Sequence, residues 1–226
     1  MVDLLIPGPE GKIEAKYTHN NNDQSPIVLI LHPDPSKGGT MNTKIVFKLY
    51  KLFVENGFSA IRFNFRGVGK STGIYDDGEG DLSDAARVLD WLQQYNTNSK
   101  ICWVAGFSFG AWVAMQLLMR RPEINGFISV SPPANLRDFS FLAPCPSSGL
   151  IVHGDKDTIA SFDSTKILSE KLSTLAAEKI LNDIDEILRQ VEPKLRPRLI
   201  AEKVNEEEYY FDIILQGENE TIFFDI

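Results

Sequence analysis

The stretch VAGFSFGAWVAMQLLM, residues 104–119, decides the fold, because an apolar run passes through two closely spaced glycines into an Ala-rich apolar segment. This order predicts a strand, a sharp turn and a helix, with Ser108 at the apex of the turn. Gly106 and Gly110 leave room for a strained turn, and the N–H of Phe109 can point at an oxyanion. The context favours a serine nucleophile over a chance Gly-Ser turn. Such a nucleophile needs a histidine as base and a carboxylate that orients it.

The rest of the chain alternates short apolar runs with amphipathic segments. A hairpin is expected first, from strands at 2–6 and 12–17. The later elements are expected as strands at 27–32, 59–65, 101–107, 126–130 and 148–154, and as helices at 43–56, 81–95, 109–121 and from about 163. The alternation predicts an α/β fold with a mostly parallel sheet and helices on both faces. Ligands then bind at the carboxyl ends of the strands.

The composition limits the classes of function. A net charge of -8 over 226 residues disfavours a nucleic acid partner, which needs clustered Lys and Arg. The N-terminus lacks an export signal, and no apolar run approaches the roughly 20 residues of a membrane span. Cys102 and Cys145 form no disulfide or metal framework. We therefore expect a cytoplasmic protein that acts on a small-molecule substrate or ligand, without a metal or organic cofactor.

The motif HGDKD, residues 153–157, follows a later expected strand. Asp157 there takes the place of the orienting acid in the chain order Ser, Asp, His. A solvated acidic turn is the alternative for this motif alone, and Asp155 is a second candidate for the acid. The Ser108 turn upstream favours Asp157.

Two other motifs suggest competing sites. GVGKST, residues 67–72, is similar to a phosphate-binding P-loop, but the pattern requires glycine where Asn64 stands, and turn formers rather than a helix follow. Acidic residues between 76 and 81 could form a cation site, but they also precede an expected helix, whose N-terminus favours negative charge. A charged helix entry is the preferred interpretation.

Five segments together resemble successive motifs of a bacterial branch of the α/β-hydrolase fold, related to dienelactone hydrolases and serine peptidase-like esterases. They are LHPDPSKGGTMNTKIV, RFNFRGVGKSTG, WVAGFSFGAW, SPPAN and PCPSSGLIVHGDKD. The resemblance covers residues 1–175 and implies Ser108 as nucleophile and Asp157 as acid. It also implies an oxyanion hole from the loop at 33–40, with Asp34, and the N–H of Phe109.

The chain departs from this family at two places. The family reads His-Pro-His-Pro in the oxyanion loop, whereas Asp34 here puts a carboxylate where negative charge develops. The family also places its catalytic histidine after the last strand, in a run resembling Gly-Ala-Asn-His-Phe-Phe, but this sequence has no histidine after His153. Asn219 or Glu220, in LQGENETIFF, stands nearest to that position.

Another histidine would have to serve as the base. His32 ends the strand expected beside the Ser108 strand and is the one candidate, although the family uses it to shape the oxyanion loop. His153 is expected to tie its strand end to the following turn, and His19 lies in an Asn-rich loop. The sequence thus predicts a hydrolase-type protein with an impaired triad, or a non-catalytic relative that binds a ligand or another protein.

The tail at 176–226 departs from the family as well. Helical spacing of apolar residues continues to about 191, and Pro193 and Pro197 stop it. Two strands joined by a turn at 217–219 follow, where the family ends in a helix. Two alternatives stay open: the tail packs on the core at 1–175, or it forms a cap or a contact between two copies of the chain.

Overall fold

The computed structural model describes residues 1–142, 145–172, 196–205, 208–216 and 221–224. Its strands are β1 (Val2–Gly8), β2 (Gly11–Thr18), β3 (Ile27–Leu31), β4 (Ser59–Phe63), β5 (Cys102–Phe107), β6 (Gly126–Val130), β7 (Ser148–Val152), β8 (Arg196–Asn205), β9 (Glu208–Gln216) and β10 (Thr221–Phe224). Its α-helices are α1 (Lys44–Glu55), α2 (Glu79–Gln94), α3 (Phe109–Arg120) and α4 (Phe162–Leu172), with short 3-10 helices η1 (Pro35–Lys37) and η2 (Ser140–Leu142).

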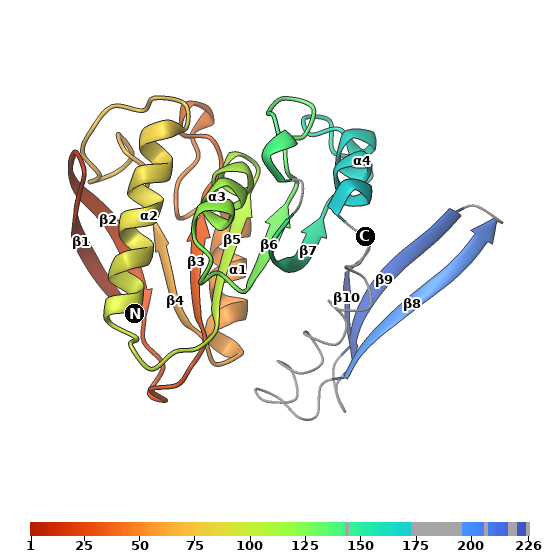
Figure 1. Ribbon diagram of the computed structural model, residues 1–226, viewed down its shortest axis with the longest axis horizontal. Coiled ribbons are helices and arrows are strands. Elements are labelled where there is room, and N and C mark those ends of the chain that lie inside the picture. Colours follow the sequence, from red (N-terminus) through yellow and green to blue (C-terminus); the bar gives the residue numbers. More distant parts are fainter. Residues whose placement is uncertain (143–144, 173–195, 206–207, 217–220, 225–226) are drawn as a thin grey trace.

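The first seven strands form one sheet in the order β1-β2-β4-β3-β5-β6-β7. β1 and β2 pair antiparallel, β2 joins β4 antiparallel, and the strands from β4 to β7 run parallel. Figure 1 shows α2 and α3 in front of this sheet and α1 behind it. The expected hairpin, parallel sheet and helices on both faces are therefore confirmed.

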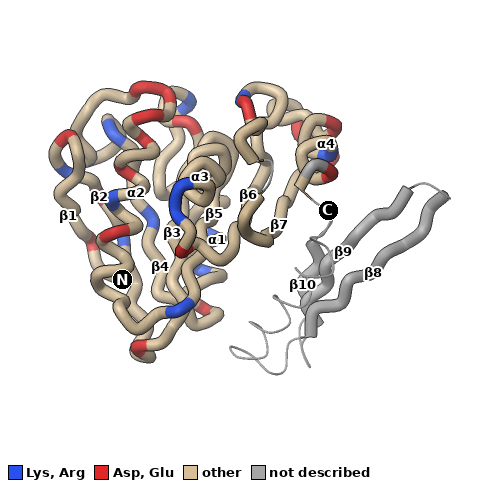
Figure 2. The backbone as a smooth tube through the Cα atoms, viewed as in Figure 1, with Lys and Arg blue, Asp and Glu red and all other residues tan. Residues whose placement is uncertain are grey.

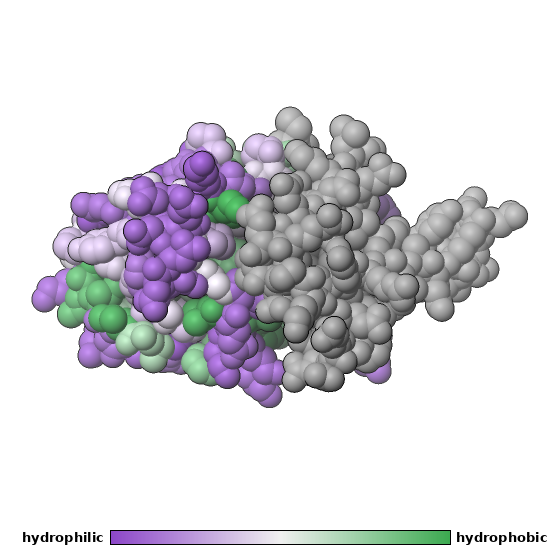
Figure 3. Space-filling view, turned by 90° about the horizontal axis from the view of Figure 1, so that it is seen from below, coloured by the Kyte–Doolittle hydropathy of each residue, from purple (hydrophilic) through white to green (hydrophobic). Residues whose placement is uncertain are grey.

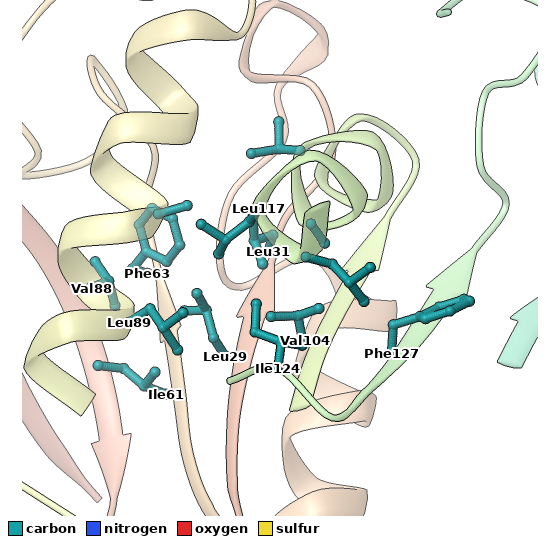
Figure 4. Close-up of a cluster of buried hydrophobic side chains, with 14 of the residues drawn as sticks. Leu29, Leu31, Ile61, Phe63, Val88, Leu89, Val104, Leu117, Ile124 and Phe127 are labelled. Atoms are coloured by element: carbon teal, nitrogen blue, oxygen red, sulfur yellow. The ribbon is translucent and has the colours of Figure 1, made fainter. Parts of the chain in front are cut away.

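Two apolar cores explain why the central strands read as continuous hydrophobic runs. Leu29 and Leu31 face α2 and α3, while Val28 and Ile30 face α1, because successive side chains of a strand point to opposite faces. Figure 4 shows the larger core, in which β3, β4 and β5 contribute side chains that meet α2 and α3. This packing fixes the carboxyl ends of β3 and β5, where the Ser108 turn and the loop of Asp34 begin.

The surface carries mixed charge and scattered apolar residues. Figure 2 shows Lys and Arg interspersed with Asp and Glu along the described backbone. The face in Figure 3 is mostly hydrophilic, with smaller hydrophobic areas among the described residues. Exposed apolar side chains of this kind are ordinary on a folded protein. Among the residues that the structure describes, no helix has the length and apolar character needed to cross a membrane.

The C-terminal strands form a second sheet, in the order β10-β9-β8, with antiparallel pairing throughout. The two expected tail strands correspond to β9 and β10. β8 was not expected, because Pro193 and Pro197 indicated only the end of a helical run. Pro197 lies near the start of β8, an edge strand, where a missing N–H costs little. The expected helical run beyond 172 and the boundary at 175 lie outside the described residues.

A buried arginine ties the hairpin to the entry of α2. Arg66 donates to both oxygens of Asp84, each at 3.0 Å, and also pairs with Glu10 and Asp76 at 3.3 Å. Asp81, fully buried nearby, has no hydrogen-bond partner for either carboxylate oxygen. Burial, reinforced by the charge of Asp76, raises the pKa of Asp81 to about 7. Within the acidic stretch at 76–81, Asp76 thus belongs to a structural network of ion pairs around Arg66.

We expect Asp81→Asn to stabilise the protein by about 2–4 kcal/mol at pH 8. The folded pKa of Asp81 lies above the unfolded value, so its contribution to stability is present below pH 3.8 and is lost as pH rises through about 7. The stabilisation by Asp81→Asn should therefore disappear near pH 3.8. Urea unfolding of the wild type and the variant at a series of pH values measures it. As a control, Asp84→Asn should destabilise by about 3 kcal/mol, because it leaves the Arg66 charge buried without its partner. A pH-independent effect of Asp81→Asn would contradict this assignment.

Candidate active site

Ser108 sits in the turn between β5 and α3, with φ 53° and ψ −119°. A positive φ is costly for a residue with a Cβ and is typical of strained functional turns. The Ser108 N–H donates to the carbonyl of Val130 at 2.9 Å, and its carbonyl accepts from Ala111 and Trp112. Within the described residues, no side chain hydrogen bonds to its hydroxyl. The expected strained turn is therefore confirmed, and Ser108 is half-buried.

The two glycines of the turn are required by contact distances. A Cβ on Gly106 would lie 2.3 Å from the carbonyl oxygen of Gly110. A Cβ on Gly110 would lie 2.4 Å from the carbonyl oxygen of His32 and 2.5 Å from that of Leu31. These neighbours are backbone atoms and cannot rotate away. The turn thus presses α3 directly against the end of β3.

His32 is fully buried, and hydrogen bonds occupy both of its ring nitrogens. Nε2 accepts from the N–H of Phe65 at 3.0 Å, which leaves Nδ1 to donate to the carbonyl of Pro33 at 2.6 Å. Burial lowers the pKa of His32 to about 4, against the opposing effects of the Pro33 hydrogen bond and the Asp34 charge. The ring has no free lone pair for a proton from Ser108. This geometry gives no support to His32 as a base and favours a structural role.

The backbone N–H groups of Phe109 and Asp34 are the candidate oxyanion donors. The N–H of Phe109 belongs to the first turn of α3, whose leading amides lack partners inside the helix. The N–H of Asp34 has no hydrogen-bond acceptor among the described residues. The Asp34 carboxylate is engaged elsewhere: its Oδ1 accepts from the Ser36 N–H at 2.8 Å and from the Ser36 hydroxyl at 2.7 Å. These bonds cap η1.

Asp157 follows β7, in a turn that holds its carboxylate ionised. Oδ1 accepts from the N–H groups of Ile159 and Ala160 at 2.9 and 3.0 Å. Burial raises the pKa of this carboxyl, but these two bonds and the Ser131 hydroxyl outweigh it and bring the pKa below its usual value. Asp155, the second candidate, is exposed.

The sheet order places a residue that the sequence analysis did not single out between nucleophile and acid. Ser108 follows β5, Asp157 follows β7, and Ser131 follows β6, which lies between those strands. Ser131 has φ 44°, and its N–H donates to the carbonyl of Val152 at 2.7 Å. Its motif, SPPAN, was quoted for the resemblance but given no role. Ser131 lacks the paired flanking glycines that signalled the strained angle of Ser108 in the sequence.

The other expected sites have structural partners. Glu14 accepts from the Lys70 N–H at 2.8 Å, and its own N–H donates to the Ser71 hydroxyl, so the loop at 67–72 binds the hairpin rather than a phosphate. His153 donates through Nε2 to the carbonyl of Ala160 at 3.1 Å, as expected. In the part of the chain that the structure describes, no three His, Cys, Asp or Glu residues are grouped to hold a metal ion. Asn219 and Glu220 lie outside it.

Comparison with known proteins agrees with this arrangement. The family model of the X-Pro dipeptidyl-peptidase (S15 family) matches residues 7–212. The chain belongs to the S15 family. One relative in sequence, the uncharacterized protein RP471 of Rickettsia prowazekii, is 49% identical over 197 residues, which cover 84% of this chain and 83% of RP471. The S15 match agrees with the resemblance of the motifs to serine peptidase-like esterases.

Solved structures support the same family. The chain matches ATU1826 from Agrobacterium tumefaciens, a protein of unknown function, with a TM-score of 0.77, 45% identity, and coverage of 87% of this chain and 100% of that one. It also matches an alpha-beta serine hydrolase homologue from Coxiella burnetii with a TM-score of 0.70, 33% identity, and coverage of 84% and 97%. The S15 chain therefore shares the fold of serine hydrolases over most of its length.

We expect Gly110→Ala to destabilise the protein by about 3 kcal/mol, because the added methyl group overlaps the carbonyl oxygens of His32 and Leu31. Gly154→Ala is the matched control: a Cβ there meets no atom within 4 Å, so its effect should stay within about 0.5 kcal/mol. Urea unfolding of both variants measures the difference. Equal effects would show that the close approach of α3 to β3 does not constrain the turn.

His32 should stay neutral well below the ordinary histidine pKa. Its contribution to stability is present above pH 6.5 and is lost as pH falls toward 4, because only the unfolded chain binds the proton in that range. In ¹⁵N NMR at pH 6, Nε2 should show the shift of an unprotonated acceptor and Nδ1 that of a donor. A ring that titrates near pH 6.5 would return His32 to consideration as the base.

Proposed function

We propose that this chain is a serine hydrolase of ester-like or amide-like bonds that works through an acyl-Ser108 intermediate at a low rate. The observation that carries the proposal is the strained Ser108 between β5 and α3, whose hydroxyl has no hydrogen-bond partner among the described residues and which the unpaired N–H of Phe109 directly follows. The peptidase name of the S15 family and the serine hydrolase homologue among the similar structures support the reaction class.

The chemistry follows from these groups. The Ser108 oxygen attacks the acyl carbon, and the N–H groups of Phe109 and Asp34 stabilise the resulting oxyanion. The bond to the leaving alcohol then breaks, and that alcohol takes up a proton in place of the one that Ser108 released to solvent. Water attacks the acyl-Ser108 ester, which restores the serine hydroxyl and releases the carboxylic acid.

The low rate follows from the missing proton acceptor. No histidine follows His153 in the sequence, and both nitrogens of His32 are already bonded. Loss of the histidine in a serine protease lowers kcat by a factor of about 10⁶, or about 8 kcal/mol. Asp157 retains the position of the orienting acid, but an imidazole is needed to connect it with Ser108.

A second candidate function is ligand or protein binding without catalysis. The hydrogen bonds at both ring nitrogens of His32 favour this alternative, because they leave Ser108 without a base among the described residues. The two functions differ in whether Ser108 forms a covalent adduct.

We expect slow hydrolysis of p-nitrophenyl acetate that depends on Ser108 and increases at least tenfold with added imidazole, which supplies the missing base. Ser108→Ala is the control and should show only the background rate of imidazole itself. A fluorophosphonate should label Ser108 in the wild type, as shown by mass spectrometry of the modified peptide.

The outcomes separate the candidates. Fast turnover without imidazole that vanishes in Ser108→Ala would overturn the proposed impairment. Turnover equal to that of Ser108→Ala, together with no labelling, would overturn the nucleophile and leave the binding function.

A further inference from the structure

The ring of Phe109, directly after Ser108, is enclosed by side chains from three segments. The ring centroids of Tyr75 and Trp112 lie 5.8 and 5.7 Å from that of Phe109. The guanidinium carbon of Arg137 lies 5.3 Å from the Phe109 centroid and 4.9 Å from that of Trp112. Arg137 therefore lies against the residue whose N–H is a proposed oxyanion donor.

Asp77 connects two of these segments. The Tyr75 hydroxyl donates to Oδ1 of Asp77 at 2.8 Å, and Arg137 forms an ion pair with the same carboxylate. Arg137 also donates to the Asp77 carbonyl at 3.4 Å. Asp77 has φ 65°, which is strained for a residue with a Cβ. The loop before α2 is thus fastened to the loop after β6.

Asp34 adds a second carboxylate to this group. Burial, the hydrogen bond to Asp77 and the charge of Asp34 together raise the pKa of Tyr75, so its hydroxyl stays protonated. The hydrogen bond to Asp77 raises the pKa of Arg137, and the charge of Asp34 adds to this effect. The ion pair of Arg137 with Asp77 therefore lies against Phe109, and the Asp34 charge acts on the same Tyr75 and Arg137 side chains. Figure 2 shows red acidic stretches and blue basic stretches on the loops along the upper edge of the sheet.

We propose that Arg137 compensates the charges of Asp34 and Asp77 beside Phe109, and so keeps the potential at the Ser108 turn favourable for an oxyanion. This inference rests on the proposed function of Ser108. An oxyanion hole requires donors and positive potential where charge develops, and a nearby carboxylate opposes that charge. Arg137 is a positioning residue here, since it acts through the field at Phe109 and does not contact the reacting atoms.

The first test uses the sign of the charge change. Arg137→Met and Asp77→Asn both break the ion pair, but they remove opposite charges. Compensation predicts that Arg137→Met slows labelling of Ser108 by an uncharged fluorophosphonate about tenfold, whereas Asp77→Asn and Asp34→Asn accelerate it about threefold. At 1 M salt, the labelling rates of all three variants should move closer to the wild-type rate. If the ion pair only holds the loops together, Arg137→Met and Asp77→Asn should slow labelling alike.

Arg121→Met is the matched control. The Arg121 side chain is 22% exposed and pairs with Asp90, and that of Arg137 is 21% exposed and pairs with Asp77. Arg121 follows α3, at the end opposite to Ser108. Its replacement should change labelling less than twofold, and a tenfold loss there would contradict a local effect.

The second test does not need a catalytic serine. In a Ser108→Cys background, the thiolate takes the place of the oxyanion charge, and its pKa reports the potential at the turn. Iodoacetamide alkylation across pH, resolved by peptide mass spectrometry from Cys102 and Cys145, gives this pKa. Adding Arg137→Met should raise it by about half a unit or more, and adding Asp77→Asn should lower it.

The two tests distinguish the failure of each proposal. If wild-type Ser108 is not labelled but the thiol pKa moves in opposite directions, the proposed function fails and charge compensation stands. If the thiol pKa is unchanged in both variants, or moves in the same direction, charge compensation by Arg137 is overturned.

Discussion

The close approach of α3 to the end of β3 is the constraint on which the rest of the site depends. Gly110 meets the carbonyl oxygens of Leu31 and His32 at distances that leave no space for a methyl group. This contact sets the angle at which β5 turns into α3 and places Ser108 in a strained conformation at the apex. The apolar cores on both faces of the sheet hold β3 and β5 in place and so maintain that strain.

The carboxylates of Asp157 and Asp34 differ in the hydrogen bonds that stabilise their charges. Asp157 lies in a turn whose N–H groups stabilise its charge, as an orienting acid requires. Asp34 accepts hydrogen bonds from Ser36 at the cap of η1, and its backbone N–H has no acceptor among the described residues. The acidic composition of the chain therefore does not decide the potential at Ser108. In our proposal, local hydrogen bonds and the position of Arg137 decide that potential.

The sequence predicted the sheet, its helices and the Ser108 turn, because apolar periodicity and paired glycines are local signals. The predicted strand boundaries were wrong where a backbone N–H bonds to a side chain instead of a neighbouring strand. The strand expected to reach 65 ends at Phe63, because the N–H of Phe65 donates to the ring of His32. The roles of Ser131, Arg66 and Arg137 depend on contacts between segments far apart in the chain, which one sequence does not reveal. The family resemblance, confirmed by the S15 match, supplied the order of the motifs but not these contacts.

The imidazole of His32, which is hydrogen-bonded at both ring nitrogens, also affects ligand binding. It joins the carbonyl of Pro33 in the oxyanion loop to the N–H of Phe65 after β4, so two separate segments hold the loop in one position. The conformational entropy of that loop is therefore lost during folding rather than on association with a ligand. A tetrahedral adduct at Ser108 would meet a preorganised loop, and its affinity would depend on the contacts it makes rather than on closure of a mobile segment.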